Sequence, residues 1–327
     1  MKRASRWLLA GLWAVSAVMW GKGPGLAATQ TETLKVAFFP GAISVPINVM
    51  ETQKLPQKFG INVDFKRFAD PEATDLAWIH GEVHLQPGIN LNQSAANFLK
   101  TGHGLVVFPT FMATNKVLVK ADSGIGQLKD LKGKRLGIPS RTSGESVVLR
   151  WLLDEAGLRW ERDVDVREIP PNVLPGMLQR AQVDAIVLFE PFASRAIDEG
   201  GGAVKLLSDL QVEWQKRKGF PLMFSAIHVD DKFARKNPEV VKKYLAMYKE
   251  AVEYIEKNPD SVYGFYRGIF KFTPEGFNLL KRNLRGIYPL EWNDKMIAGM
   301  KDYLSLAVRY GLLPRVPDEM FTREFAP

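Results

Sequence analysis

The stretch RLGIPSRTSGESVVLRWLLDEAG, residues 135–157, gives the clearest indication of the fold class. Its apolar start, Arg135–Pro139, predicts a short buried strand, and Glu145–Ala156 has the spacing of an amphipathic helix that Gly157 ends. A strand that passes through a polar loop, here Ser140–Gly144, into such a helix is the repeating unit of α/β folds.

The same unit repeats before residue 135. We expect strands at Leu34–Phe39, Ile61–Phe68, Glu82–Gln86 and Leu105–Phe111. The segments between them have helical spacing: Ser44–Phe59, Pro71–Ile79 and Leu91–Lys100, the last preceded by a turn at Pro87–Asn90. This rhythm predicts an open, mainly parallel sheet with helices on both faces.

A second series of strands and helices includes the opening stretch. It comprises a solvated helix and turn at Leu128–Lys134, strands at Asp165–Ile169 and Asp184–Phe189, and helices at Leu174–Ala181 and Pro191–Glu199. Extended segments at Thr114–Lys120 and Phe220–Val229 flank this series and are the predicted crossings between two lobes. We assign residues 28–116 and 222–327 to the first lobe and residues 117–221 to the second. From Asp231 onward we expect helices at Pro238–Lys257, Pro274–Leu284 and Lys295–Tyr310.

Composition excludes several classes of protein. The chain has 327 residues, of which 46% are apolar and 24% charged, a balance typical of globular proteins with sizeable cores. The sequence contains no cysteine, which excludes disulfides, thiolate metal sites, a cysteine nucleophile and a lipidated N-terminal cysteine. Four of the 44 basic residues lie in residues 1–27, so 40 basic residues face 36 acidic residues in the remainder. That charge balance does not indicate a nucleic-acid-binding protein.

The first 27 residues have the pattern of a secretory signal peptide. Lys2, Arg3 and Arg6 precede an apolar run from Trp7 to Trp20, and small residues, Gly25 and Ala27, follow. The run is shorter than the ~20 residues that span a bilayer as a helix. We therefore expect export to the periplasm with the peptide removed; the alternative is an uncleaved membrane anchor.

Candidate ligand-binding residues follow the predicted strands, because ligands of open parallel sheets bind beyond the carboxyl ends of the strands. The residues selected on this ground are Gly41, Ala42, Ser44, Gly88, Asn90, Thr114, Ser140, Arg141, Thr142, Ser143, Asn172 and Glu190.

The loop Ser140–Gly144 is the strongest local signal. Thr142 and Glu145 fit a capping box with Thr142 as the N-cap. A helix N-terminus offers free N–H groups and partial positive charge to an anion, and the guanidinium of Arg141 would add to both. The alternative is an ordinary helix cap beside a solvated arginine.

Glu190 ends an apolar strand, and Pro191 biases its backbone toward an extended conformation. Its carboxylate could accept hydrogen bonds from an amine or hydroxyl of a ligand. The alternative is an ion pair with Arg195 on the next helical turn.

Signals for catalysis are weak. His80 and His84 have the spacing of a metal pair, but Gly81 interrupts a shared helical face. The sequence contains neither a Gly-x-Ser-x-Gly nucleophile elbow nor a phosphate-binding loop. Aromatic residues at Phe265–Phe272 fit a packed helical surface better than a nucleic-acid site. We predict no catalytic residue, metal or cofactor.

The chain resembles the periplasmic solute-binding proteins of ABC importers for taurine, aliphatic sulfonates and nitrate, which share their fold with thiamine-precursor-binding proteins. The resemblance extends from about Leu34 to Asp260. It rests on five segments: LKVAFFPGAIS (34–44), GEVHLQPG (81–88), LKDLKGKRLGIPSRTSG (128–144), QVDAIVLFEPFAS (182–194) and KFARKNPEVVKKYL (232–245).

This resemblance implies a monomeric type II binding protein, with two crossing strands as its hinge, that delivers a small organic anion to a permease in the inner membrane. Arg141 and the following helix would hold the anionic group, and Glu190 an amine. The loops at 69–72 and 87–90 depart from the family pattern, which favours a larger or more apolar anion. The alternatives are a heteroaromatic thiamine-precursor-like or aromatic acid ligand, a pyrimidine-synthase-type enzyme, which the absence of cysteine disfavours, and a sensory binding subunit.

Overall fold

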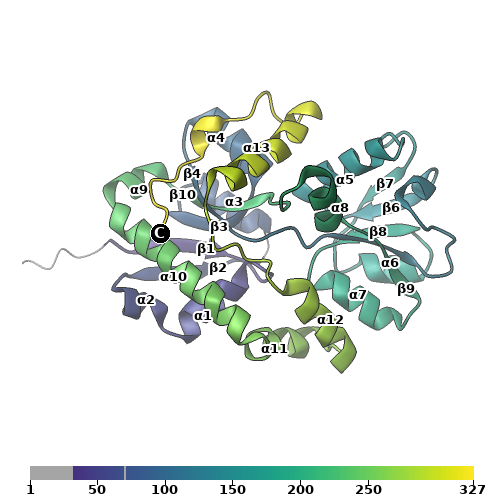
Figure 1. Ribbon diagram of the computed structural model, residues 1–327, viewed down its shortest axis with the longest axis horizontal. Helices are drawn as coiled ribbons and strands as arrows, with labels where there is room; N and C mark the ends of the chain where they lie inside the picture. Colours follow the sequence, from purple (N-terminus) through teal and green to yellow (C-terminus); the bar gives the residue numbers. More distant parts are fainter. Residues whose placement is uncertain (1–31, 70) are drawn as a thin grey trace, which may run out of the picture. The chain divides into compact units, whose positions relative to one another are not determined.

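The computed structural model describes residues 32–327 with the exception of Asp70. The predicted signal peptide, residues 1–27, lies outside the described residues. The described chain forms two mixed five-stranded sheets with helices on both sides, as the sequence predicts (Figure 1). We call the parts built on these sheets lobe A and lobe B.

Sheet A forms the centre of lobe A. Its strands lie in the order β2 (Val63–Arg67), β1 (Leu34–Phe38), β3 (Leu85–Asn90), β10 (Ser225–Val229) and β4 (Leu105–Pro109). β1 pairs in parallel with β2 and β3, whereas β10 runs antiparallel to both of its neighbours.

Sheet B repeats this arrangement in lobe B. Its order is β7 (Asp165–Glu168), β6 (Arg135–Ile138), β8 (Ala185–Leu188), β5 (Lys116–Lys120) and β9 (Val204–Asp209). β6 pairs in parallel with β7 and β8, and β5 is the antiparallel strand. The antiparallel strand therefore occupies the fourth position in both sheets.

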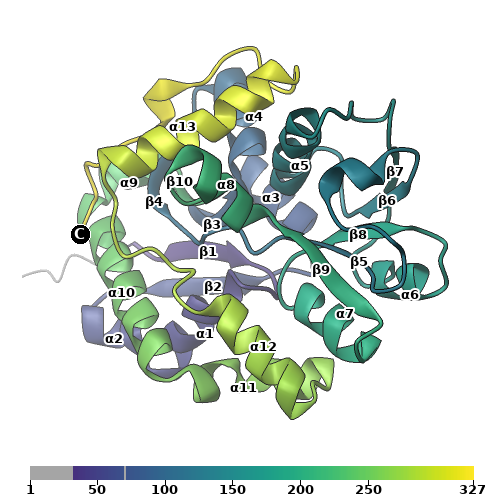
Figure 2. The same ribbon diagram turned by 45° about the vertical axis from the view of Figure 1, so that its right-hand side comes forward.

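The helices of lobe A are α1 (Ser44–Thr52), α2 (Leu55–Phe59), α3 (Pro71–Ile79), α4 (Leu91–Thr101), α9 (Asp231–Lys236), α10 (Pro238–Lys257), α11 (Pro259–Phe270) and α13 (Asp294–Arg309). Lobe B carries α5 (Gly144–Glu155), α6 (Leu174–Gln179), α7 (Phe192–Gly200) and α8 (Leu210–Lys218). A further helix, α12 (Pro274–Leu284), packs on α7, as Figure 2 shows. Single 3₁₀ turns lie at Leu128–Leu131 and Asp318–Met320.

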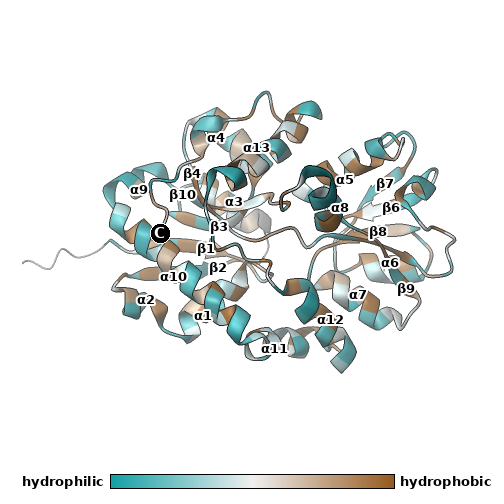
Figure 3. Ribbon diagram, viewed as in Figure 1, coloured by the Kyte–Doolittle hydropathy of each residue, from teal (hydrophilic) through white to brown (hydrophobic). Residues whose placement is uncertain are grey.

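The strands are mainly hydrophobic, and the helices around them alternate hydrophobic and hydrophilic residues (Figure 3). Val36, Val117, Ile186 and Ile227, all on interior strands of the sheets, are fully buried. This pattern is typical of sheets that are covered on both faces.

The predicted helix Ser44–Phe59 is wrong as a single element. α1 ends at Thr52, Lys54 adopts a left-handed conformation with φ 52°, and α2 begins at Leu55. Pro56 has no N–H to donate to the Thr52 carbonyl, so one helix cannot run through this point.

The expectation of a strand at Glu82–Gln86 followed by a turn is also wrong, because β3 continues through Pro87 and Gly88 to Asn90. Pro87 is tolerated because it lies opposite Ile227, where the pairing with β10 shifts at an irregularity. Strand β9 and helix α8, which lie between Val204 and Lys218, were not predicted from the sequence.

The crossings between the lobes are shorter than predicted. Residues 116–120 and 225–229 of the two predicted segments are strands β5 and β10, which leaves residues 110–115 and 219–224 to join the lobes. The two joining segments are hydrogen-bonded to each other, because the Ala113 N–H donates to the Leu222 carbonyl at 2.9 Å. The lobe boundaries assigned from the sequence stay a prediction.

Candidate functional site

The carboxyl ends of the parallel strands in both sheets face the crossings. Ser225, the first residue of β10, lies opposite Asn90, the last residue of β3. Lys116, the first residue of β5, lies opposite Leu188, the last residue of β8. Each antiparallel strand therefore enters its sheet at the edge where the predicted ligand loops begin.

The loop between β1 and α1 is buried and held in place by hydrogen bonds to its carbonyl groups. The Gly41 carbonyl accepts from the Ser44 hydroxyl at 2.8 Å and from the Tyr266 hydroxyl at 2.7 Å. The Ala42 carbonyl accepts from the Tyr288 hydroxyl at 2.7 Å. Burial raises the pKa of both tyrosines, so each remains a donor at neutral pH. Neither tyrosine was predicted from the sequence.

Gly88 brings β3 close to this loop. Its φ is 140°, and a Cβ atom at this position would lie 2.2 Å from Cδ1 of Ile43. Only glycine fits such an approach and such a backbone conformation. Two of the predicted loops, Gly41–Ser44 and Gly88–Asn90, are therefore in contact.

The loop after β6 does not form the predicted capping box. Ser143, not Thr142, is the N-cap of α5, and no side chain caps the helix. The Ser143 hydroxyl instead donates to the Ser140 carbonyl at 2.9 Å. The Thr142 carbonyl accepts from the side-chain amide of Asn92 at 2.6 Å, which connects this loop to α4 of lobe A.

Glu145 explains why the capping box fails. Its carboxyl group is turned inward and is only 6% exposed, so it does not reach back to Thr142. Burial raises its pKa, and a hydrogen bond from its own N–H opposes that shift. The Tyr303 hydroxyl donates to Oδ1 of Asn92 at 3.1 Å, so lobe A places polar groups beside the same helix start.

Arg141 is exposed and its guanidinium already has partners. It donates to the Val166 carbonyl at 2.5 Å, forms an ion pair with Glu161 and lies 3.8 Å from the carboxylate of Glu168. Its predicted role as the anion ligand requires an exchange of these partners and stays a prediction.

Glu190 is fully buried, with 0% of its surface exposed. Its carboxylate accepts from the Ser194 N–H at 3.1 Å and from the Asn283 side-chain amide at 2.7 Å, and its own N–H donates to the hydroxyl of Thr114 at 3.2 Å. Burial raises its pKa, and the charge of Lys116 opposes that shift. The alternative pairing with Arg195 is wrong, because Arg195 donates to Glu199.

The structure thus brings together Glu190 and Thr114, joins the loop at Gly41–Ser44 to Gly88, and links Thr142 to Asn92. Asn172 is exposed on the loop between β7 and α6. Asn92 and Asn283 were missed, because a polar residue on an amphipathic helix gives no signal of the surface it will meet.

Two further observations concern the described residues only. They contain no group of three His, Asp or Glu side chains placed to hold a metal ion. Within residues 32–69 and 71–327 we also find no helix with the length and apolar character needed to cross a membrane.

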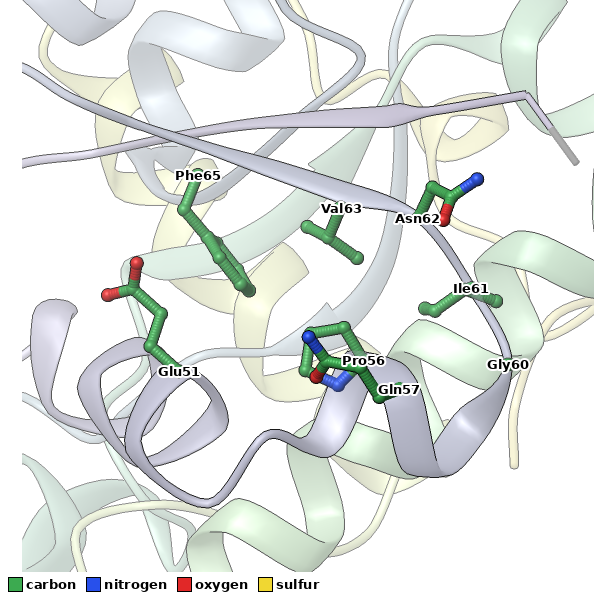
Figure 4. A pocket seen from close by; sticks show the side chains of 8 residues that line it. All are labelled: Glu51, Pro56, Gln57, Gly60, Ile61, Asn62, Val63 and Phe65. Atoms are coloured by element: carbon green, nitrogen blue, oxygen red, sulfur yellow. The ribbon is translucent and has the colours of Figure 1, made fainter.

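A hollow of about 480 Å³ lies elsewhere on lobe A (Figure 4). Its lining includes Pro56 and Gln57 of α2 and residues 60–63, which lead into β2. It is therefore at the amino end of β2, at the opposite end of the strand from the predicted ligand loops.

Residues 27–262 match the family model described as the NMT1-like family. The chain belongs to this family.

Three relatives of the NMT1-like chain bear names that describe binding proteins. A Brucella abortus (strain 2308) protein named as a binding protein is 26% identical over 247 residues, covering 72% of this chain and 71% of the relative. An ABC transporter periplasmic binding protein of Brachyspira hyodysenteriae (strain ATCC 49526 / WA1) is 25% identical over 266 residues, covering 73% and 69%. The aliphatic sulfonates-binding protein of Escherichia coli (strain K12) is 24% identical over 259 residues, covering 77% and 74%.

Solved structures share the two-lobed fold. The periplasmic aliphatic sulphonate binding protein SsuA from Escherichia coli has a TM-score of 0.73 at 18% identity, covering 88% of this chain and 90% of SsuA. The desulfurization enzyme DSZB has a TM-score of 0.67 at 14% identity, covering 90% and 97%. The fold alone therefore accommodates both binding and catalysis. The three sequence relatives are named as binding proteins, one of them of an ABC transporter.

Proposed function

We propose that the protein is an extracytoplasmic receptor that captures a small organic anion, such as a sulfonate or a taurine-like compound, between its lobes. The observation that carries this proposal is the start of α5, which has no side-chain cap and lies at the carboxyl edge of sheet B beside Ser140, Thr142 and Ser143. The relatives named for aliphatic sulfonates support the same ligand class.

The chemistry of this helix start suits an anion. The first N–H groups of a helix have no carbonyl partner within the helix, and the helix dipole places partial positive charge there. Side-chain hydroxyls add donors without adding charge. When water is excluded, each hydrogen bond to a charged group contributes more than it does in solvent.

The amine of a taurine-like ligand would meet Glu190 only after a rearrangement, because the carboxylate has no exposed surface and is enclosed by its donors Ser194 and Asn283. We therefore infer that the anionic group, and not the amine, determines binding. Gly41, Ala42, Ser44, Gly88, Asn90 and Thr114 would form the opposing wall from lobe A and the crossing.

A specific observation favours an aromatic acid as the second candidate. The rings of Phe189, Phe192 and Phe270 form an edge-to-face series beside Glu190, with centroid distances of 5.4 Å for both neighbouring pairs. Phe189 and Phe270 are only partly buried. Such rings would pack against an aromatic ligand better than against taurine.

A thermal-shift screen tests the proposal. The compounds are taurine, ethanesulfonate, nitrate, benzoate, benzenesulfonate and an aminopyrimidine. A ligand at a hundredfold its Kd adds about 2.7 kcal/mol of stability, so a true ligand raises the Tm by several degrees. We expect a sulfonate to give the largest shift. A shift only with the aminopyrimidine would contradict the anion proposal.

Arg141→Ala is the informative variant in this screen. Because its guanidinium is paired with Glu161, we expect the affinity for the best sulfonate to change by less than about threefold. A loss of about tenfold or more would show that Arg141 leaves Glu161 and contacts the ligand, since a charged hydrogen bond contributes about 1.5–3 kcal/mol.

The partner and compartment follow from the same proposal. The receptor would act in the periplasm, after removal of its signal peptide, as a monomer that delivers ligand to the permease of an ABC importer in the inner membrane. A neighbouring gene for a sensor in place of a permease would indicate the sensory role instead.

A further inference from the structure

Three polar side chains at the carboxyl edge of sheet A are left without hydrogen-bond partners. Within the described part of the chain, no donor or acceptor meets Oδ1 of Asn90, Oγ1 of Thr110 or Oγ of Ser225, and all three atoms are buried. Thr110 is 0% exposed and Ser225 4%. Thr110 and Ser225 are not among the residues predicted from the sequence.

These side chains lie next to one another on the same face of the sheet. Ser225 is the cross-strand partner of Asn90, and the pairing of Ala226 with Pro109 places Thr110 beside Ser225 on the other side. Cross-strand partners point to the same face. Gly88 and Phe108, two residues before Asn90 and Thr110, identify this face as the one covered by Ile43 and α10, since Gly88 abuts Ile43 and Phe108 contacts Tyr248.

Nearby groups that could pair with these atoms have other partners. The Tyr248 hydroxyl donates to the Thr110 carbonyl at 2.6 Å and not to its side chain. Asn90 is the N-cap of α4, yet its side chain caps no N–H group. A buried polar group without a partner costs about 1–3 kcal/mol, so three together at one edge of a sheet are unusual in a folded protein. They are also at the edge that faces the crossings, where a ligand of this fold binds.

We propose that Asn90, Thr110 and Ser225 form a subsite for an uncharged hydroxyl or amide group of the ligand. The inference rests on the proposed function, in which the anionic group of the same ligand lies at the start of α5. The two hydroxyls can donate and accept, whereas Oδ1 of Asn90 only accepts. A hydroxyl group on the ligand satisfies an acceptor and a donor together, whereas an anionic oxygen would face the Asn90 acceptor. The substrate class is then a hydroxy- or amido-substituted organic anion.

A matched pair of sulfonates tests this subsite by calorimetric titration: 2-hydroxyethanesulfonate and ethanesulfonate, which differ by one hydroxyl group. We expect the wild-type protein to bind the hydroxylated compound at least tenfold more tightly. The preference should fall below twofold in the double variant Thr110→Val, Ser225→Ala. Ser208→Ala is the control, because the Ser208 hydroxyl is another buried group without a partner, but lies on β9 of lobe B. Equal affinity of the wild-type protein for both compounds would overturn the subsite while leaving the sulfonate proposal intact.

Thermal unfolding of the ligand-free variants separates the subsite from a structural role. If the two hydroxyls have no partner until the ligand binds, the variants Thr110→Val and Ser225→Ala should have melting temperatures at or above that of the wild-type protein, because each substitution removes an unpaired polar group. A fall of several degrees would show that an internal water or a protein group already uses them, which overturns the subsite. If neither sulfonate binds, the sulfonate proposal fails. The melting temperatures of the ligand-free variants then decide by themselves whether the proposal of a subsite stands.

Discussion

Glu190 has no exposed surface, and its two carboxylate oxygens accept hydrogen bonds from the Ser194 N–H and the Asn283 side chain. Asn283 belongs to α12, far from Glu190 in the sequence. The sequence analysis identified Glu190 because it follows a strand, but its observed partners make it a connection between α7 and α12. The carboxylate of Glu190 stabilises the contact between α7 and α12 through the hydrogen bonds that it accepts from Ser194 and Asn283.

Glu190→Ala should therefore destabilise the protein by about 1–3 kcal/mol, because it leaves the Asn283 and Ser194 donors buried without an acceptor. The free energy of unfolding in urea measures this loss. Arg195→Ala is the matched control: it removes an exposed ion pair with Glu199, which contributes about 0–1 kcal/mol. If Glu190→Ala lowers the free energy of unfolding no more than Arg195→Ala does, the buried carboxylate contributes no more to stability than an exposed ion pair.

The contribution of Glu145 to stability should depend on pH in the opposite sense to that of a carboxylate whose pKa is lowered by folding. Burial raises its pKa in the folded state above its ordinary value. The folded protein therefore binds the proton more tightly than the unfolded chain does. The resulting stability is fully present below the ordinary pKa of a glutamate and is lost as the pH rises through the raised pKa.

Comparison with Glu145→Gln measures this effect, because glutamine imitates the protonated acid. The free energy of unfolding of the wild-type protein should fall relative to that of the variant as the pH is raised from below the ordinary pKa of a glutamate to neutral pH. Curves that stay parallel over this range would show that Glu145 has an ordinary pKa in the folded state.

At the scale of elements, the contact between α12 and α7 depends on one glycine. Asp198, near the end of α7, accepts hydrogen bonds from the N–H of Thr273, at 2.9 Å, and from its hydroxyl, and Thr273 is the N-cap of α12. A carboxylate at a helix N-terminus is favourable. A Cβ atom on Gly276 would lie 2.1 Å from Cγ of Asp198, so the carboxylate fits only because this position has no side chain.

Gly276→Ala should cost about 1–3 kcal/mol, because the added methyl group forces Asp198 away from the start of α12. Gly268→Ala in α11 is the control. A Cβ atom there meets nothing within 4 Å, and alanine in place of glycine within a helix adds about 0.5–1 kcal/mol of stability. Melting temperatures that rise for both variants would contradict the close contact between Asp198 and α12.

The elements show what local sequence determines. α10 begins at Pro238 and ends at Lys257, as predicted, because a proline at its start and a regular apolar face are both visible in the local sequence. α5 was placed correctly but its cap was not, since the burial of Glu145 is a tertiary feature that the local pattern does not show. The contacts of Asn283 and Arg141 were likewise beyond local patterns, because they depend on how distant helices and strands pack.

At the scale of the whole molecule, the two sheets repeat one topology, and residues 110–115 and 219–224 run between them at their carboxyl edges. The division into two α/β lobes with two crossings was predicted, because two series of strands and helices separated by extended segments allow few connections, whereas the strand orders were not predicted. It places the loops of both lobes where a single small molecule can contact both. We propose that ligand binding holds the lobes together by supplying hydrogen bonds that the protein leaves open at this boundary.

The claim that the protein captures one small molecule without altering it is best tested by equilibrium dialysis against the compound that gives the largest thermal shift. The compound is recovered afterwards and identified by nuclear magnetic resonance. We expect saturable uptake of one molecule per chain and recovery of that molecule unaltered. Conversion of the compound into a product, or retention that never saturates, would contradict a receptor that captures one small molecule intact.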